Sequence, residues 1–166
     1  MKNSWSSYFL KIAEIVKSRS DCPRRQVGAV FVKDRRIVAT GFNQAPSGVK
    51  HCSEAGCILI HGHCARSIHA ELNGILNATK AGQTLEGSTA YVTSFPCFRC
   101  MSSMRNAGVI GIVYKDPYEY NDQEKQLLGE LIKFFCIEEI DDMKHPADAK
   151  DMLSTFDFGK IGPSEF

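Results

Sequence analysis

The chain has 166 residues, 43% hydrophobic and 23% charged, so it is long enough to bury a core as one globular domain spanning residues 1–166. Its 20 lysines and arginines and 19 acidic residues give a formal net charge of +1, which provides no overall basic field for nucleic acid. The longest apolar runs, such as residues 27–32, are too short to span a membrane, and the polar-interleaved start lacks a secretory signal. We therefore expect a cytoplasmic protein whose partners are neither membranes nor nucleic acids.

The first half of the chain predicts one helix and a hairpin. A helix is expected from about residue 4 to 18, because five apolar side chains fall on one face at helical spacing: Trp5, Phe9, Ile12, Ala13 and Val16. Two strands follow at residues 26–33 and 36–43, and the polar segment KDRR between them is the expected turn. Residues 44–66 then show no clean period. An irregular insert of that length is unusual in a compact domain unless it is functional or cross-linked.

The second half alternates helices and strands. Helices are expected at residues 68–81, 97–107 and 122–134, and Gly82 and Gly108 are stop signals for the first two. Strands are expected at residues 88–95, 109–115 and 136–140. This alternation predicts an α/β architecture with helices on both faces of a sheet. The polar segment 144–166 is expected to form a surface tail.

Two short stretches carry candidate chemistry. In HAELN, His69 and Glu71 are two positions apart, and Ser67 is a plausible N-cap that would put both near the first turn of a helix. In PCFRC, Cys97 and Cys100 are spaced to share one helix face. Pro96 suits the first turn of that helix. Helix starts favour carboxylates, neutral imidazoles and thiolates over their protonated forms.

These residues together predict a catalytic zinc site. His69, Cys97 and Cys100 supply three ligands of a tetrahedral zinc ion, which leaves the fourth position to water. Zinc lowers the pKa of bound water to about 7, and Glu71 can then take its proton.

The pattern H-x-E followed by P-C-x-x-C is that of the zinc nucleobase deaminases. Together with QVGAVFV, GFNQAPSG, CARSIHAELNGILNA, GSTAYVTSFPCFRC and NAGVIGIVY, it resembles the deoxycytidylate deaminases of the cytidine deaminase superfamily, especially the bacterial and phage branch that includes the late competence proteins. The resemblance implies a three-layer α/β/α fold around a mixed five-stranded sheet. It also implies zinc-dependent hydrolysis of deoxycytidine monophosphate (dCMP) to deoxyuridine monophosphate (dUMP) and ammonia, which supplies dUMP for thymidylate synthesis.

The resemblance also implies a second, structural zinc site in the insert. The positions that match Cys22 and Cys52 are ligands in phage relatives. The chemistry of the remaining residues points to two more ligands from Cys57, His63 and Cys64. Buried free thiols are the alternative. Cys136, within an apolar strand, is expected to be a core residue.

Substrate contacts follow less directly from the sequence. Asn43 resembles the family residue that contacts the sugar, and the backbone amide of Ala70 is expected to meet the base. A phosphate needs cationic side chains or backbone amides, and a pyrimidine needs an apolar slot. The corresponding candidates are Arg24, Arg25, Arg66 and Lys115 for the phosphate, and Tyr118 or Tyr120 for the pocket lining.

Regulation is where the chain departs from its relatives. Many deoxycytidylate deaminases are hexamers that deoxycytidine triphosphate activates and thymidine triphosphate inhibits, with a GYNG turn near the effector site. Here the turn reads GFNQ. Phe42 lacks a hydroxyl, and Gln44 puts a side chain where glycine would let a phosphate approach the backbone. We expect a homo-oligomer, a hexamer in the resembling family, with altered or weakened nucleotide regulation.

Four alternatives remain at this point. A closed zinc knuckle would need a fourth protein ligand and would leave the H-x-E carboxylate unexplained. A tRNA adenosine deaminase would need a basic surface, and Phe95 stands where such enzymes often have an acidic residue. A pterin or riboflavin-pathway deaminase would bring a second reductase domain. A non-catalytic scaffold with this fold would have no need to keep all four chemical residues.

Overall fold

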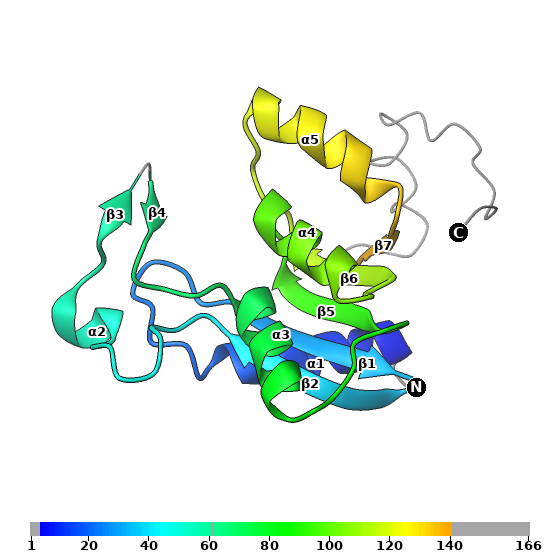
Figure 1. Ribbon diagram of the computed structural model, residues 1–166, viewed down its shortest axis with the longest axis horizontal. Coiled ribbons are helices and arrows are strands. Elements are labelled where there is room, and N and C mark those ends of the chain that lie inside the picture. Colours follow the sequence, from blue (N-terminus) through cyan, green and yellow to red (C-terminus); the bar gives the residue numbers. More distant parts are fainter. Residues whose placement is uncertain (1–3, 61, 141–166) are drawn as a thin grey trace.

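A mixed sheet of five strands forms the centre of the molecule, in the order β2-β1-β5-β6-β7 (Figure 1). The computed structural model describes residues 4–60 and 62–140. The strands β2, β1 and β5 pair antiparallel, whereas β5, β6 and β7 pair parallel. The expected mixed five-stranded sheet is therefore confirmed. Its strands are β1 (Gly28–Lys33), β2 (Arg36–Phe42), β5 (Thr89–Ser94), β6 (Gly111–Asp116) and β7 (Cys136–Glu139).

The turn between β1 and β2 is tighter than the four-residue segment suggested. Lys33 pairs with Arg36, which leaves two residues in the loop. These are Asp34 and Arg35, with φ of 50° and 60°. Positive φ at both loop positions is the conformation that matches the right-handed twist of the flanking strands.

Helices cover both faces of the sheet, as predicted. On one face lies α1 (Trp5–Lys17), which Ser4 caps and which buries Phe9, Leu10 and Ala13 against β1 and β5. Trp5, expected on the buried face, is 46% exposed because the helix begins there at the edge of the core. The opposite face carries α3 (Ala70–Lys80), α4 (Phe98–Asn106) and α5 (Asp122–Ile132). The larger core lies between these three helices and the sheet.

The insert has more structure than its lack of period predicted. It contains α2 (Cys52–Ala55) and a hairpin of β3 (Leu59–Ile60) and β4 (His63–Cys64). These elements extend to one side of the sheet, next to the starts of α3 and α4 (Figure 1). Elements of two to four residues are too short for a hydrophobic period to reveal.

Two other expectations can be compared with the fold. Cys136 is exposed, so its prediction as a core residue was wrong. It begins the edge strand β7, where only alternate side chains turn inward. The predicted tail, residues 144–166, lies outside the described residues.

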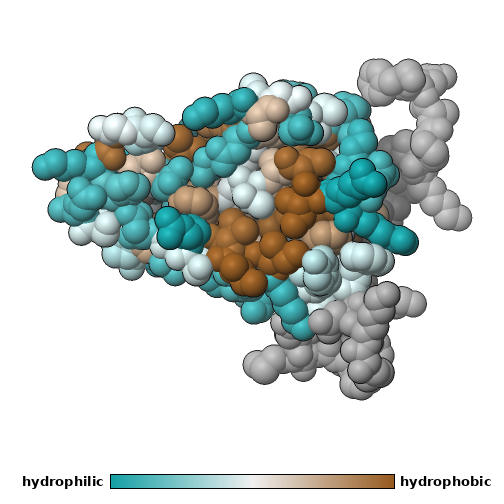
Figure 2. Space-filling model, turned by 90° about the horizontal axis from the view of Figure 1, so that it is seen from below, coloured by the Kyte–Doolittle hydropathy of each residue, from teal (hydrophilic) through white to brown (hydrophobic). Residues whose placement is uncertain are grey.

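Apolar side chains are exposed on α1, β2 and α3, among them Ile15, Ile37 and Leu76. The face seen from below carries a broad apolar area (Figure 2). Such areas commonly mark contacts with other macromolecules. None of the helices in the described part of the chain has the length and apolar character that crossing a bilayer requires.

Candidate active site

His69, Cys97 and Cys100 meet where two helices begin. Their ligand atoms lie within 4.8 Å of one another. His69 and Cys97 are the N-cap residues of α3 and α4, and neither makes a side-chain capping hydrogen bond. Ser67 is therefore not the N-cap of α3, and Pro96 precedes α4 instead of opening it. The extended backbone at each N-cap, with ψ of 153° and 162°, lets the two side chains turn toward each other.

The geometry of this group fits a tetrahedral zinc ion. The Nδ1 atom of His69 lies 3.5 Å from the Sγ atom of Cys97 and 3.5 Å from that of Cys100. Zinc bonds of about 2.3 Å to sulfur and about 2.05 Å to nitrogen, at a tetrahedral angle, separate the two ligand atoms by about 3.6 Å. Cys100 and His69 lower the pKa of the Cys97 thiol to about 4, so its thiolate is favoured. His69 therefore already stands at the distance from each cysteine that shared zinc ligands require.

Glu71 lies in the first turn of α3 and is only 4% exposed. Burial raises the pKa of its carboxyl group. The carboxyl lies beside the Cys100 thiol and close to the charge of His69. Glu71 is thus a buried carboxyl group beside His69, Cys97 and Cys100. It is in a position to exchange protons with a molecule bound next to these three residues.

A cavity of about 370 Å³ opens onto this group. Its walls come from the segment before β1, the residue after β2, the insert, the start of α3, the end of β5 and the loops after β5 and β6. Five of the predicted substrate residues line it: Arg24, Arg25, Asn43, Ala70 and Tyr118. A cavity of this size suits a small molecule with a few polar groups.

Three other predicted substrate residues do not line the cavity. The Arg66 guanidinium donates to the carbonyl groups of Gly56 and Lys50, so it ties the insert together. Lys115 pairs with Glu14 of α1 at 3.4 Å, because it points to the other face of the sheet. The Tyr120 hydroxyl donates to the carbonyl oxygen of Pro96 and thereby braces the residue before Cys97.

Arg25 is held in place by its neighbours. Its Nη2 atom donates to the Ser94 hydroxyl at 2.7 Å, and its guanidinium lies 5.8 Å from the centre of the Tyr118 ring. Asn43 fixes the same loop, since its side chain accepts from the Val27 amide at 2.7 Å and donates to the Arg25 carbonyl at 2.8 Å. One N–H of the Asn43 amide remains for a ligand.

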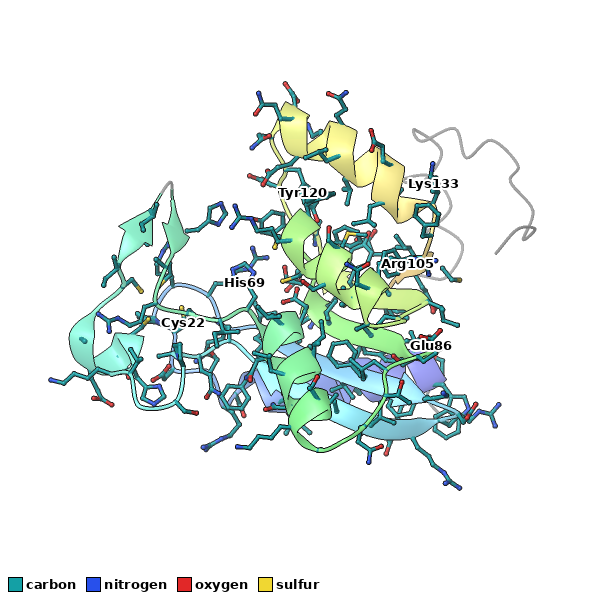
Figure 3. All side chains as sticks on the ribbon, viewed as in Figure 1. Cys22, His69, Glu86, Arg105, Tyr120 and Lys133 are labelled. Carbon is teal, nitrogen blue, oxygen red and sulfur yellow. The ribbon has the colours of Figure 1, made fainter. Side chains whose placement is uncertain are left out.

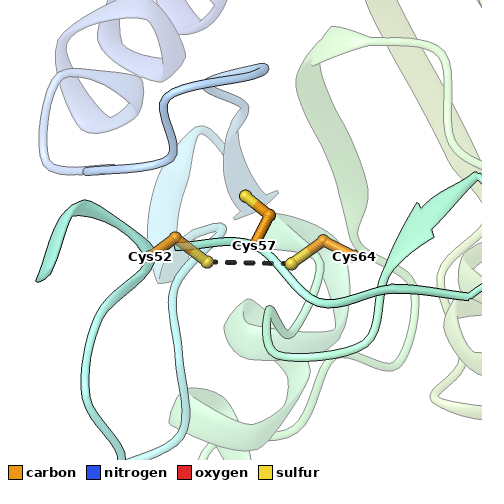
Figure 4. A group of neighbouring side chains, drawn as sticks. All are labelled: Cys52, Cys57 and Cys64. Carbon is orange, nitrogen blue, oxygen red and sulfur yellow. Dashed lines mark hydrogen bonds between the residues drawn. The ribbon is translucent and has the colours of Figure 1, made fainter. Parts of the chain in front are cut away.

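The insert holds a second group of metal-capable side chains. The sulfur atoms of Cys52, Cys57 and Cys64 lie within 4.8 Å of one another (Figure 4). Cys52 and Cys64 are 3.7 Å apart, and two sulfur ligands of a tetrahedral zinc would be about 3.8 Å apart. Burial, Cys64 and, to a smaller extent, Cys22 raise the pKa of the Cys57 thiol. Cys22 lies beside the insert, whereas His69 faces the opening between the insert and α4 (Figure 3).

Ser94 and Phe95 line the cavity and were not identified as binding residues from the sequence. Both come at the end of β5, and Phe95 packs edge-on against Tyr114 at 4.6 Å. A signal was present, because ligands commonly bind beyond the carboxyl ends of parallel strands.

Comparison with known proteins shows which family and which relatives this chain resembles. The family model of the cytidine and deoxycytidylate deaminase zinc-binding region matches residues 3–115. ComE operon protein 2 of Bacillus subtilis is 37% identical over 159 residues, which are 96% of this chain and 84% of that protein. The deoxycytidylate deaminase of Mycobacterium phage D29 is 39% identical over 121 residues, 66% of this chain and 93% of that protein.

Among solved structures, the dCMP deaminase of cyanophage S-TIM5 in complex with dCMP and dUMP matches with a TM-score of 0.71 at 31% identity. The match covers 84% of this chain and 99% of that chain.

Proposed function

Because the chain belongs to the cytidine and deoxycytidylate deaminase family, we propose that it hydrolyses dCMP to dUMP and ammonia and so supplies dUMP for thymidylate synthesis. One observation carries the proposal: His69, Cys97 and Cys100 meet beside the buried Glu71 at a cavity of nucleotide-binding size. The phage relatives that are named as deoxycytidylate deaminases support dCMP as the substrate.

In this proposal His69, Cys97 and Cys100 hold the catalytic zinc ion. When bound, the zinc ion supplies a water molecule activated for attack at neutral pH. The structural role of the chain is to bring one imidazole and two thiols together from two helix starts. A closed zinc knuckle would need a fourth protein ligand, and among the described residues this group has three.

Glu71 moves the protons. Its carboxylate takes a proton from the attacking water and delivers it to ring nitrogen N3 of cytosine. It then takes the proton of the hydroxyl group formed at C4 and delivers it to the amine, so that the C4–N bond breaks, ammonia leaves and the C4 carbonyl of uracil forms. Its burial excludes bulk water and raises its pKa, so the carboxyl can hold the proton between these steps. General acid–base groups of this kind contribute about 10²–10⁴-fold to rates.

The cavity residues bind the nucleotide. The backbone amide of Ala70 faces the base and Asn43 the sugar, while Arg24 and Arg25 attract the phosphate. Tyr118 borders the cavity and fixes the Arg25 guanidinium from one side.

A second zinc ion is proposed in the insert, held by Cys22, Cys52, Cys57 and Cys64. The sulfur spacing supports Cys52, Cys57 and Cys64 as three of the ligands, and Cys22 lies beside the insert as the fourth. All seven cysteines, each within the described residues, are free thiols. Structural zinc sites of four sulfurs are closed to water and stabilise the fold. Cysteines that serve as zinc ligands and not as disulfides fit a reducing cytoplasmic setting.

The chain is further proposed to form a homo-oligomer, with a hexamer as the expected form, through the apolar area over α1, β2 and α3. Nucleotide regulation is proposed to be weakened. Gln44, whose backbone pairs with that of Ile68 just before α3, replaces the glycine that would let a phosphate approach the backbone of this turn.

The proposal is tested by assaying purified protein against deoxycytidine, dCMP, deoxycytidine triphosphate and an adenosine-bearing tRNA stem-loop. We expect dCMP to have the highest kcat/KM. Turnover of the RNA alone would select a tRNA adenosine deaminase instead, and turnover of none would favour a non-catalytic scaffold.

A further inference from the structure

The insert supplies one wall of the active-site cavity. Gly62, His63 and Cys64 line the cavity, which also contains His69 and Glu71. Cys64 belongs in addition to the thiol group of the insert, whereas the exposed His63 lies outside that group. The strand β4 therefore carries one member of the thiol group, Cys64, and beside it His63, which borders the cavity.

The proposed metal site of the insert is complete without His63. Cys52, Cys57 and Cys64 have sulfur atoms within 4.8 Å of one another, and Cys22 lies beside the insert (Figure 3). A tetrahedral zinc ion takes four ligands. His63 is consequently available to contact another molecule.

Two arginine side chains, Arg24 and Arg25, line the same cavity as His63. Arg24 donates to the carbonyl oxygen of Gly62 at 3.1 Å, which places its guanidinium next to His63 along the hairpin. Within residues 4–60 and 62–140, neither Arg24 nor Arg25 pairs with a carboxylate, and Glu71 is the one acidic residue that lines the cavity. Two unpaired guanidinium groups on one side of a cavity favour an anionic ligand, in a chain whose net charge is only +1.

We propose that His63 is a specificity residue that contacts the 5′-phosphate of the nucleotide together with Arg24 and Arg25, and that it is not a ligand of the insert metal. The inference rests on the proposed function. A neutral imidazole already carries one N–H donor, so the contact needs no change of protonation. The insert metal thereby acts on substrate selection, because it holds Cys64 and so positions the adjacent His63.

The test compares His63→Gln and His63→Ala with His51→Gln. His51 is a matched control, since it lies on the insert and pairs with Asp21 but does not line the cavity. Elemental analysis measures the zinc content of each variant. Steady-state kinetics are measured with dCMP and with deoxycytidine. Calorimetry gives the dissociation constants of dUMP and deoxyuridine. We expect zinc to stay at the wild-type value in all three variants. The His63 variants should raise the KM for dCMP and the Kd for dUMP about tenfold, a loss of about 1.4 kcal/mol. Constants for the two nucleosides should not change.

Loss of one zinc ion per chain in the His63 variants would show that His63 is a metal ligand. Equal effects on nucleotide and nucleoside, or none on either, would show that it does not contact the phosphate. If the wild-type protein neither acts on dCMP nor binds dUMP, the proposed function itself is wrong. That outcome is seen in the wild type and is therefore distinguishable from a failure of the His63 proposal, which is seen only in the variants.

Discussion

Replacing Gly41 with alanine should displace the helix that carries the catalytic residues. A Cβ atom at position 41 would lie 2.2 Å from the carbonyl oxygen of Ala70 and 2.3 Å from the amide nitrogen of Gly74. Both are backbone atoms at the start of α3. To reach the 3.4 Å of ordinary van der Waals contact, α3 and β2 must separate by about 1.2 Å. His69 and Glu71 flank Ala70 and would move with it.

Two magnitudes follow from this displacement. Inserting a methyl group into a packed contact costs about 2 kcal/mol, which lowers the Tm of a domain of this size by roughly 6 °C. A shift of about 1 Å at catalytic groups can lower kcat about 100-fold. Thermal unfolding and steady-state kinetics of Gly41→Ala measure both effects.

Gly129→Ala is the matched control. Gly129 lies inside α5, and an added Cβ would meet nothing within 4 Å. This variant should be more stable than the wild type by about 0.5–1 kcal/mol and equally active, because alanine restricts the unfolded chain more than glycine does. Wild-type kcat and Tm in Gly41→Ala would refute the argument that this contact sets the position of α3.

Four further predictions concern the catalytic carboxylate, the metal of the insert, the support of the active site and the regulation by nucleotides. Glu71→Gln should keep its zinc and lose about 10²–10⁴-fold in kcat, measured by metal analysis and kinetics, and substantial activity would contradict proton transfer through Glu71. Cys22→Ser should reduce zinc from about two to about one per chain and lower the Tm, whereas one zinc in the wild type would leave the insert cysteines as free thiols. Tyr120→Phe should lose about 1 kcal/mol of stability in denaturant titration, since the carbonyl of Pro96 loses its donor; an unchanged midpoint would mean that water replaces the hydroxyl. Deoxycytidine triphosphate should change dCMP saturation little, and a sigmoidal curve that it makes hyperbolic at micromolar levels would show that Gln44 permits effector binding.

The elements that periodicity can reveal were predictable. The segments around Phe9, Val30 and Val92 have the length and apolar pattern of helix or buried strand, and each occurs as predicted. Helix starts were less predictable. Ser67 has good capping chemistry, but α3 begins only after His69, because Ile68 still pairs with Gln44 in an extended bridge.

Each half of the chemical motif was recognisable in the sequence, because His69 lies close to Glu71 and Cys97 lies close to Cys100. The two halves are 28 residues apart and meet only in the fold, where α3 and α4 begin. Substrate residues were not predictable, since an arginine in the sequence does not show which way it points. Arg25 lines the cavity and Arg66 supports the insert, although both are arginines near cysteines. The pairing of Lys115 with Glu14 depends on a contact between residues far apart in the chain.

Conversion of dCMP in heavy-oxygen water, followed by mass spectrometry of the nucleotide product, tests the central claim most directly. Hydrolytic deamination predicts one solvent oxygen in dUMP, as the carbonyl oxygen on C4 of uracil, and one ammonia per dUMP formed by the wild-type protein. Under the same conditions Glu71→Gln, with unchanged zinc, should form almost none. No dUMP from zinc-loaded wild-type protein, or dUMP without solvent oxygen, would contradict the account.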